Sequence, residues 1–173
     1  MGPPGSGKTS VGKALAKTLG WQFVDLDQRI EAELKTTVQQ LFSQFGESEF
    51  RRLETEALLS LVSEKMGKTV VATGGGIVTR EANFDLMKRI GPIVCLQADV
   101  ETLTARLRGD LTRPLLATGG DLQSLSEKLT ELMNDRQPYY SLPETTVTTD
   151  GLTPQEVAAV IVERLGMRTD SSR

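Results

Sequence analysis

The sequence predicts an α/β protein of three αβα layers, with a parallel β-sheet as the middle layer. Helical and strand-like stretches alternate along the chain, and the strands are apolar throughout, as in Thr69-Val70-Val71-Ala72. Strands of this kind are buried on both faces, so helices must cover both sides of a parallel sheet. A third observation is the glycine-rich segment 2–9 before a helix, which is typical of a phosphate-binding loop.

The expected elements follow from spacing and from helix-ending residues. In the first helix, 8–19, Val11, Leu15 and Leu19 share one face, and Gly20 ends it. The pattern then predicts strands over 21–26, 69–72, 93–97 and 145–148. It predicts a helical stretch from 30 to 45 broken at Gly46, and helices over 47–65, 81–89, from the cap Asp99 to about 107, over 122–136 and from Pro154 to 165.

We expect one domain over residues 1–166, with a lid at about 108–120 and a polar tail over 167–173. A phosphate-binding loop follows a buried strand, but only Met1 precedes the glycines. The strand before the loop is therefore missing from the chain. The start was assigned too late, the chain was shortened, or it folds without the strand; we favour a shortened chain.

Composition excludes several functions. The chain has no histidine, which rules out histidine bases and histidine metal ligands. A net charge of −3 and an aromatic content of 5% argue against a nucleic-acid partner. The lone Cys95 favours a reducing compartment and a buried structural role. No apolar run is long enough to span a membrane, and the N-terminus has no signal-peptide pattern.

Segment 2–9 is the candidate nucleotide site. Backbone N–H groups around Gly5, Ser6 and Gly7 can surround phosphate oxygens, and the following helix adds its positive N-terminal end. The Lys8 side chain would reach the β- and γ-phosphates, and the Thr9 hydroxyl would ligate Mg²⁺, with Ser10 beside them. The alternative is a glycine-rich turn that only caps a helix, which the downstream residues disfavour.

Asp25 and Asp27 end the next predicted strand. At a spacing of two in a strand they would point to one face, toward the loop. One carboxylate can assist Mg²⁺ through water, and the other can orient an acceptor hydroxyl and accept its proton. A solvated acidic turn is the alternative, but the position after the loop helix favours function.

Gly74, Gly75 and Gly76 follow another strand and would let backbone approach a ligand, unless they are merely a flexible loop. Arginines supply candidate cations for an anionic ligand at positions 51, 52, 108, 113 and 136. Most surface arginines are simply solvated, and Arg136 could merely cap the end of its helix.

Together these motifs resemble the shikimate kinase family of the nucleoside-monophosphate-kinase-like P-loop fold. The resemblance runs from Gly2 to about Leu165. Its motifs are Gly-x-x-Gly-x-Gly-Lys-Thr, Asp25-x-Asp27, Gly46-Glu47-Ser48-Glu49-Phe50-Arg51, Gly74-Gly75-Gly76, Thr112-Arg113-Pro114-Leu115-Leu116 and Arg136-x-Pro138-x-Tyr140.

The resemblance implies transfer of the ATP γ-phosphoryl group to the 3-hydroxyl of shikimate, in the chorismate route to aromatic amino acids. It implies that Asp27 holds ring hydroxyls, that Arg51 and Arg136 grip the carboxylate beside Gly74–Gly76, and that Arg113 closes on ATP. Lys8, Asp27 and Arg113 would be catalytic, while Thr9 and, through water, Asp25 would hold Mg²⁺. The lid is short, which leaves Arg108 without a clear role, and 149–154 lies where the family contacts adenine. In this family the first strand is central in the sheet, so the resemblance implies that its absence leaves two neighbouring strands with unpaired backbone groups and an open slot in the core.

Two other functions stay open at this point: a related kinase for gluconate or a nucleotide, and a non-catalytic relative that only binds. We expect a monomer that works with ATP, Mg²⁺ and shikimate, without nucleic acid or membrane. Its location would be the cytoplasm, or the plastid stroma in a plant.

Overall fold

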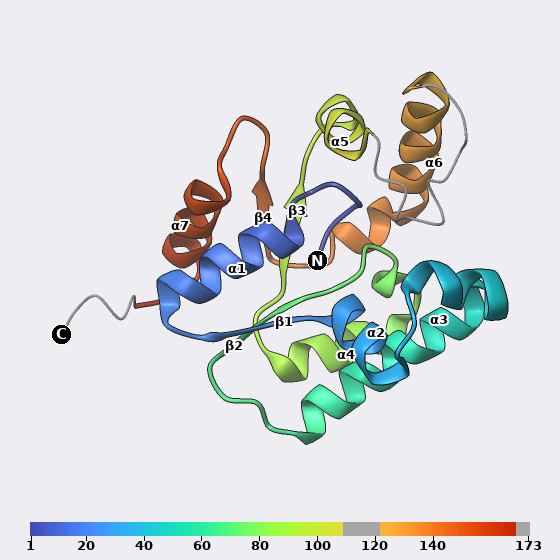
Figure 1. Ribbon diagram of the computed structural model, residues 1–173. Helices are drawn as coiled ribbons and strands as arrows, with labels where there is room; N and C mark the ends of the chain where they lie inside the picture. Colours follow the sequence, from blue (N-terminus) through green and yellow to red (C-terminus); the bar gives the residue numbers. More distant parts are fainter. Residues whose placement is uncertain (109–121, 169–173) are drawn as a thin grey trace.

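The structure is a computed structural model that describes residues 1–108 and 122–168 (Figure 1). The expected lid, with Arg113, and most of the polar tail lie outside these residues. The described elements, in chain order, are α1 (Lys8–Leu19), β1 (Gln22–Asp25), α2 (Leu26–Leu34), α3 (Val38–Ser63), β2 (Thr69–Ala72), the 3-10 turn η1 (Ile77–Thr79), α4 (Glu81–Ile90), β3 (Val94–Gln97), α5 (Val100–Leu107), α6 (Leu122–Tyr140), β4 (Thr145–Thr148) and α7 (Pro154–Arg164).

The strands form two parallel pairs. β1 pairs with β2, with Gln22 opposite Thr69, and β3 pairs with β4, with Val94 opposite Thr145. Among the described strands, no ladder joins β2 to β3. The two pairs are therefore separate, as expected, but the edge of β3 is not wholly unpaired, because Met1 donates to the Val94 carbonyl and accepts the Leu96 N–H.

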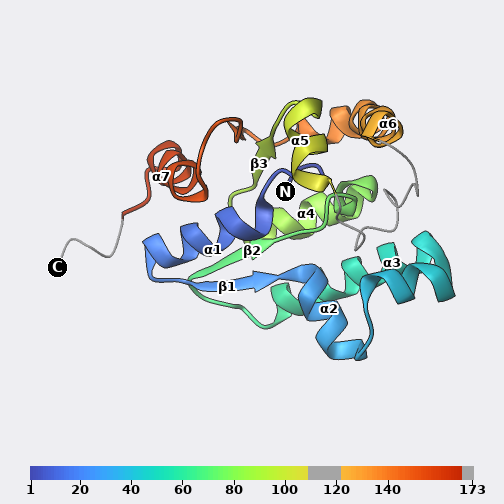
Figure 2. The same ribbon diagram turned by 45° about the horizontal axis from the view of Figure 1, so that its top comes forward.

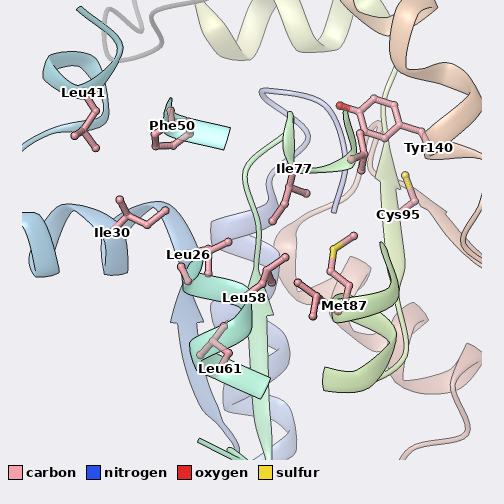
Figure 3. Packing of buried hydrophobic residues seen from close by; sticks show 13 residues of the cluster. Leu26, Ile30, Leu41, Phe50, Leu58, Leu61, Ile77, Met87, Cys95 and Tyr140 are labelled. Atoms are coloured by element: carbon pink, nitrogen blue, oxygen red, sulfur yellow. The ribbon is translucent and has the colours of Figure 1, made fainter. Parts of the chain in front are cut away.

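Helices cover both faces of the strands, which confirms the three-layer prediction. Figures 1 and 2 show α1 beside α7 on one side and α3 with α4 on the other. Each face has its own core. The first, around Leu15, Leu19 and Ile161, packs α1 and α7 on the strands. The second, around Leu58 and Met87, packs α3 and α4, and Figure 3 shows these two side chains facing each other.

Local residue choices explain where several helices begin and end. Asp99 accepts a hydrogen bond from the Thr102 N–H at 2.6 Å, which caps α5 as expected. Gly20 adopts φ 65° and ends α1. Gly46 has φ 80° and ψ 175°, so it divides α3 into two helical parts, as the sequence indicated.

Two expected boundaries are wrong. Helix α6 continues to Tyr140 rather than ending at Arg136, although it contains Pro138. The Tyr140 hydroxyl donates to the Gly75 carbonyl at 2.6 Å, and this buried bond holds the extra turn in place. Strand β1 ends at Asp25, and Leu26 already begins α2.

Candidate active site

The loop before α1 has the geometry of a phosphate cradle. Gly5 and Gly7 adopt φ 79° and 85°, a left-handed conformation that favours glycine. A side chain at Gly5 would also press on Leu107 at 3.0 Å. Ser6 is buried, and its hydroxyl donates to the Pro3 carbonyl at 2.8 Å. Its side chain therefore stabilises the loop, and its backbone remains the part suited to a phosphate.

The next two loop residues begin helix α1. The Lys8 ammonium donates to the Pro3 carbonyl at 2.7 Å, so in this state it lies folded over the loop. Ser10 is exposed on the first turn of the helix. The helix N-terminus that Lys8 begins places a partial positive charge at the same place.

Thr9 and Asp25 meet at the edge of this loop. The Thr9 hydroxyl donates to Asp25 Oδ2 at 2.7 Å, while Asp25 Oδ1 accepts the backbone N–H groups of Asp27 and Gln28. Asp25 is thus the N-cap of α2, and this cap fixes its carboxylate against the loop. A hydroxyl and a carboxylate are hard oxygen ligands of the kind Mg²⁺ prefers, so the pair fits that ion.

Mg²⁺ normally keeps several waters and takes the rest of its ligands from one or two side chains and substrate phosphates. Residues 1–108 and 122–168 contain no group of three or more metal-ligating side chains. The Thr9–Asp25 pair beside the phosphate cradle is consistent with that sparse type of site.

Asp27 lies near the phosphate loop as expected, but on a different element. It lies in the first turn of α2 rather than in the strand, so the argument from strand alternation is wrong. The turn of the helix nevertheless directs it toward the second glycine loop, because a Cβ on Gly74 would lie 3.0 Å from Asp27 Oδ1.

Arg51 is buried and held in place by two carboxylates. It is 6% exposed, and its guanidinium donates to Glu54 at 2.6 Å and to Glu47 at 2.8 Å. The rings of Phe42 and Phe50 lie 5.9 Å and 5.6 Å from it, at cation–π distance. These contacts come from both parts of α3, so the bend at Gly46 helps to shape the site.

Arg136 is also buried, at 8% exposure, but its surroundings differ. Within the described residues no carboxylate lies within 4.0 Å of it. It lies inside α6, so the alternative that it merely caps a helix end is wrong. By contrast, Arg52 is exposed and paired with Glu49 and Glu56 on the surface.

Close neighbours leave no room for a side chain at any of the three glycines after β2. A Cβ on Gly76 would collide with the Arg51 guanidinium, and a Cβ on Gly74 would lie 2.5 Å from Glu54 Oε1. A Cβ on Gly75 would lie 3.1 Å from the Gly2 carbonyl. The glycines therefore bring the phosphate loop, Arg51 and Asp27 into one place.

These residues surround one cavity of about 350 Å³, which we call the acceptor pocket. Eight positions of its wall were predicted from the sequence: Thr9, Asp25, Asp27, Arg51, Gly74–Gly76 and Arg136. Gln28, Glu31 and Glu54 complete its polar lining. Lys8 does not line it, and Arg113 lies outside the described residues. Two arginines opposite a carboxylate suit a small acceptor with both a carboxylate and hydroxyl groups.

Sequence reasoning missed Glu54, the buried carboxylate of the pocket. It is 0% exposed, and burial raises its pKa to about 7, against the opposing effect of Arg51. The proximity of the Asp27 carboxylate raises its pKa further. The available signal was its spacing of three from Arg51 on a helix, which places the two side chains together.

Arg106 was also missed. Its guanidinium donates to the Thr149 hydroxyl at 2.9 Å and to the Thr149 carbonyl at 2.8 Å, beside the Gly5 carbonyl. It therefore joins α5 to the segment after β4, the region expected to contact adenine. Arg108 is exposed at the end of α5.

A phosphate cradle, a Thr–Asp pair suited to Mg²⁺ and an adjoining charged pocket define a P-loop phosphotransferase of small molecules. A family model described as shikimate kinase matches residues 4–166. The chain belongs to the shikimate kinase family.

The individual relatives agree with this assignment. The chain is 41% identical over 163 residues to a shikimate kinase of Thermodesulfovibrio yellowstonii, covering 94% of this chain and 91% of that one. It is similar to the structure of a shikimate kinase from Acinetobacter baumannii in complex with shikimate, with a TM-score of 0.88, 35% identity and coverage of 95% and 89%. A shikimate kinase structure from Bacteroides thetaiotaomicron gives a TM-score of 0.88 at 31% identity, with 96% of each chain covered.

Proposed function

We propose that this chain transfers the γ-phosphoryl group of ATP to the 3-hydroxyl of shikimate. The observation that carries the proposal is the acceptor pocket, where Asp27, Arg51 and Arg136 converge beside the phosphate loop. Its family membership supports the same reaction.

In the proposed reaction the 3-hydroxyl oxygen forms a bond to the γ-phosphorus of ATP. The bond from that phosphorus to the β–γ bridging oxygen breaks, and ADP leaves with the electron pair. Asp27 accepts the hydroxyl proton. Such a transfer depends on positioning and on neutralising charge, more than on covalent help from the protein.

The remaining roles are part of the proposal. Arg51 and Arg136 bind the acceptor carboxylate, with Gly74–Gly76 shaping the pocket. Lys8, Ser10 and the backbone of Gly5–Gly7 bind the ATP phosphates, and Arg113 neutralises charge from the lid. Thr9 and Asp25, the latter through water, would hold a Mg²⁺ ion that offsets phosphate charge.

Oligomeric state and location are also proposals. We infer a monomer in the cytoplasm, or in the stroma of a plant plastid. The single buried cysteine agrees with a reducing compartment. In the part of the chain that the structure describes, no helix has the length and apolar character needed to cross a membrane. Light scattering of the purified chain would test the monomer.

The decisive experiment measures ADP release with Mg²⁺-ATP and shikimate, gluconate or a nucleoside monophosphate as acceptor. We expect turnover with shikimate that exceeds the other two by at least 100-fold, with phosphoshikimate identified by mass spectrometry. Faster turnover with gluconate or a nucleotide would overturn the substrate assignment. Tight binding of ATP and shikimate by calorimetry without any product would instead identify a non-catalytic binding protein.

A further inference from the structure

The acceptor pocket contains a further carboxylate, Glu31, that has no part in the reaction described above. Glu31 lies on α2 one helical turn after Asp27, so the two side chains share a face of that helix, and both line the pocket. Glu31 Oε1 accepts the Val38 N–H at 2.8 Å, and the Glu31 carbonyl accepts the Thr36 N–H at 3.2 Å. Glu31 therefore joins the helix that carries Asp27 to the first residue of α3.

The start of α3 depends on this bond. The first N–H groups of a helix have no partner within the helix itself. The Thr37 hydroxyl accepts the Gln40 N–H at 3.2 Å, whereas the Val38 N–H is satisfied by Glu31 from the neighbouring helix. A carboxylate also interacts favourably with the positive end of a helix. Because the cap at Val38 comes from α2, it fixes the start of α3 relative to α2.

The part of α3 that begins here, residues 38–45, is set apart from the rest of the helix. Gly46 has non-helical backbone angles, and no described atom lies within 4 Å of its Cβ position. The segment packs through Leu41, which belongs to the same core as Ile30 of α2 (Figure 3). Its position is therefore determined by its contacts with α2 and not by a continuous helix.

Segment 38–45 carries one of the rings that hold Arg51. Phe42 lies one turn after Val38, and the centroid of its ring is 4.8 Å from that of Phe50. The guanidinium carbon of Arg51 lies 5.9 Å from the Phe42 ring. Val38, Phe42 and Arg51 also line the acceptor pocket together. A shift at the start of α3 therefore moves Phe42 and changes the side of the pocket on which Arg51 lies.

We propose that Glu31 is a positioning residue for the acceptor. It holds the start of α3 against α2, and through Phe42 it sets the position of Arg51 relative to Asp27. It acts through the Val38 N–H and does not touch the acceptor. The identity of that acceptor, a small carboxylated polyol, rests on the proposed function.

The first test compares Glu31→Ala with Glu31→Gln. Alanine removes the acceptor of the Val38 N–H, whereas the amide oxygen of glutamine can still accept this bond. We expect Glu31→Ala to raise the KM for shikimate about tenfold or more, with kcat within about threefold and the KM for ATP within about twofold. Glu31→Gln should return the KM for shikimate to within about threefold of the unmodified chain. The control is Glu33→Ala, which removes an exposed carboxylate from the same helix and should change no constant.

The second test removes the donor instead of the acceptor. Val38→Pro deletes the N–H, and proline is well tolerated at the first position of a helix. Thr37, with φ −89° and ψ 154°, already has the extended backbone that a residue before proline requires. We expect Val38→Pro to raise the KM for shikimate as Glu31→Ala does, and the double variant to show no further increase. Val38→Ala, which retains the N–H, is the matched control and should change the KM less than threefold.

Hydrogen exchange gives a readout that needs no kinase activity. In Glu31→Ala the amides of residues 42–45 should exchange at least about tenfold faster, because the start of their segment is released. The amides of residues 54–62, after the bend, should change less than twofold, and Glu31→Gln should resemble the unmodified chain in both parts. This measurement tests the placement of segment 38–45 even if the unmodified chain does not phosphorylate shikimate, an outcome that would contradict only the proposed function.

Three results would overturn the proposal. An unchanged KM for shikimate in Glu31→Ala would show that segment 38–45 keeps its place without this carboxylate. Equal increases in KM for Glu31→Ala and Glu31→Gln, with unchanged exchange, would show that the charge of Glu31 acts on the acceptor directly. Faster exchange in both parts of α3 alike would assign Glu31 a role in the stability of the whole helix.

Discussion

The two cavities of this protein have similar volumes and opposite walls. The acceptor pocket, of about 350 Å³, is lined by two buried arginines and by four buried or half-buried carboxylates, those of Asp25, Asp27, Glu31 and Glu54. A second cavity, of about 420 Å³ between β2 and β3, which we call the slot, is lined mainly by apolar side chains such as those of Leu58, Met87 and Ile161. Buried charges are costly unless a partner compensates them, so the pocket is built for a charged ligand. The walls of the slot are mainly apolar, so changes there act on packing.

This comparison predicts that changes in the pocket affect ligand binding and chemistry and, where they disturb the buried Arg51–Glu54 pair, stability as well. The largest expected effect is for Asp27→Asn, which retains the shape of the side chain but cannot accept a proton as carboxylate does. We expect kcat with shikimate to fall at least 100-fold. The KM for ATP should change less than about threefold, because Asp27 lies on the acceptor side of the phosphate loop.

The matched control for Asp27→Asn is Asp85→Asn, which neutralises an exposed carboxylate on α4. We expect steady-state rates for this variant within twofold of the unmodified chain. A similar kcat for Asp27→Asn and the unmodified chain would show that another group takes the proton.

The next effect separates the two arginines of the pocket. Removing either side chain should raise the KM for shikimate by roughly 10- to 100-fold, the loss expected for a charge-assisted hydrogen bond, with little change in the affinity for ATP. Arg51→Ala should also lower the free energy of unfolding at pH 8 by about 1–3 kcal/mol, because it leaves Glu54 buried and unpaired. Arg136→Ala should lower it less, because Arg136 forms no ion pair within the described residues and acts on Glu54 only through its charge.

Isothermal calorimetry with each ligand and urea unfolding would measure these two differences. Arg52→Ala is the control, since Arg52 is the exposed neighbour of Arg51 on the same helix. If both pocket variants weakened ATP and shikimate binding equally, the two arginines would not form the carboxylate clamp.

A smaller difference, in the KM for shikimate, is expected between alanine substitutions at one glycine of each cavity. Gly76→Ala places a methyl group against the Arg51 guanidinium, whereas Gly67, at the edge of the slot, has no atom within 4 Å of its Cβ position. We expect Gly76→Ala to raise the KM for shikimate about fivefold or more by displacing Arg51. Gly67→Ala should leave KM within twofold. An unchanged KM for Gly76→Ala in steady-state assays would mean that Arg51 can move without loss of binding.

The sequence was sufficient to predict the three layers and most of the pocket. Local signals fix these features, such as the left-handed glycines of the loop, the cap at Asp99 and the helix start at Pro154. The element that carries Asp27 was mispredicted. The strand ends one residue earlier than expected because Asp25 caps α2, and Asp27 lies in the first turn of that helix. Capping and strand continuation are both compatible with Asp25-Leu26-Asp27, and tertiary contact with Thr9 decides between them.

Glu54 and the end of α6 depended on contacts distant in the sequence. Glu54 reads as one more acidic residue on a helix, and only folding places it at zero exposure between Arg51 and Asp27. Pro138 predicts the end of a helix. The bond from Tyr140 to Gly75, which outweighs this preference, joins residues 65 positions apart.

Smaller still is the effect of Glu54 on the pH dependence of stability. Its pKa is raised to about 7 from the 4.5 of an unfolded chain, mainly by burial. The folded protein therefore binds more protons than the unfolded chain between pH 4.5 and pH 7, and the contribution of Glu54 to stability falls as pH rises through that interval. In the unmodified chain this effect should lower the free energy of unfolding by roughly 1–3 kcal/mol between pH 5 and pH 8, and in Glu54→Gln this decrease should be absent. Urea unfolding over this pH range measures it. Glu47→Gln, which changes the exposed partner of Arg51, should retain the decrease.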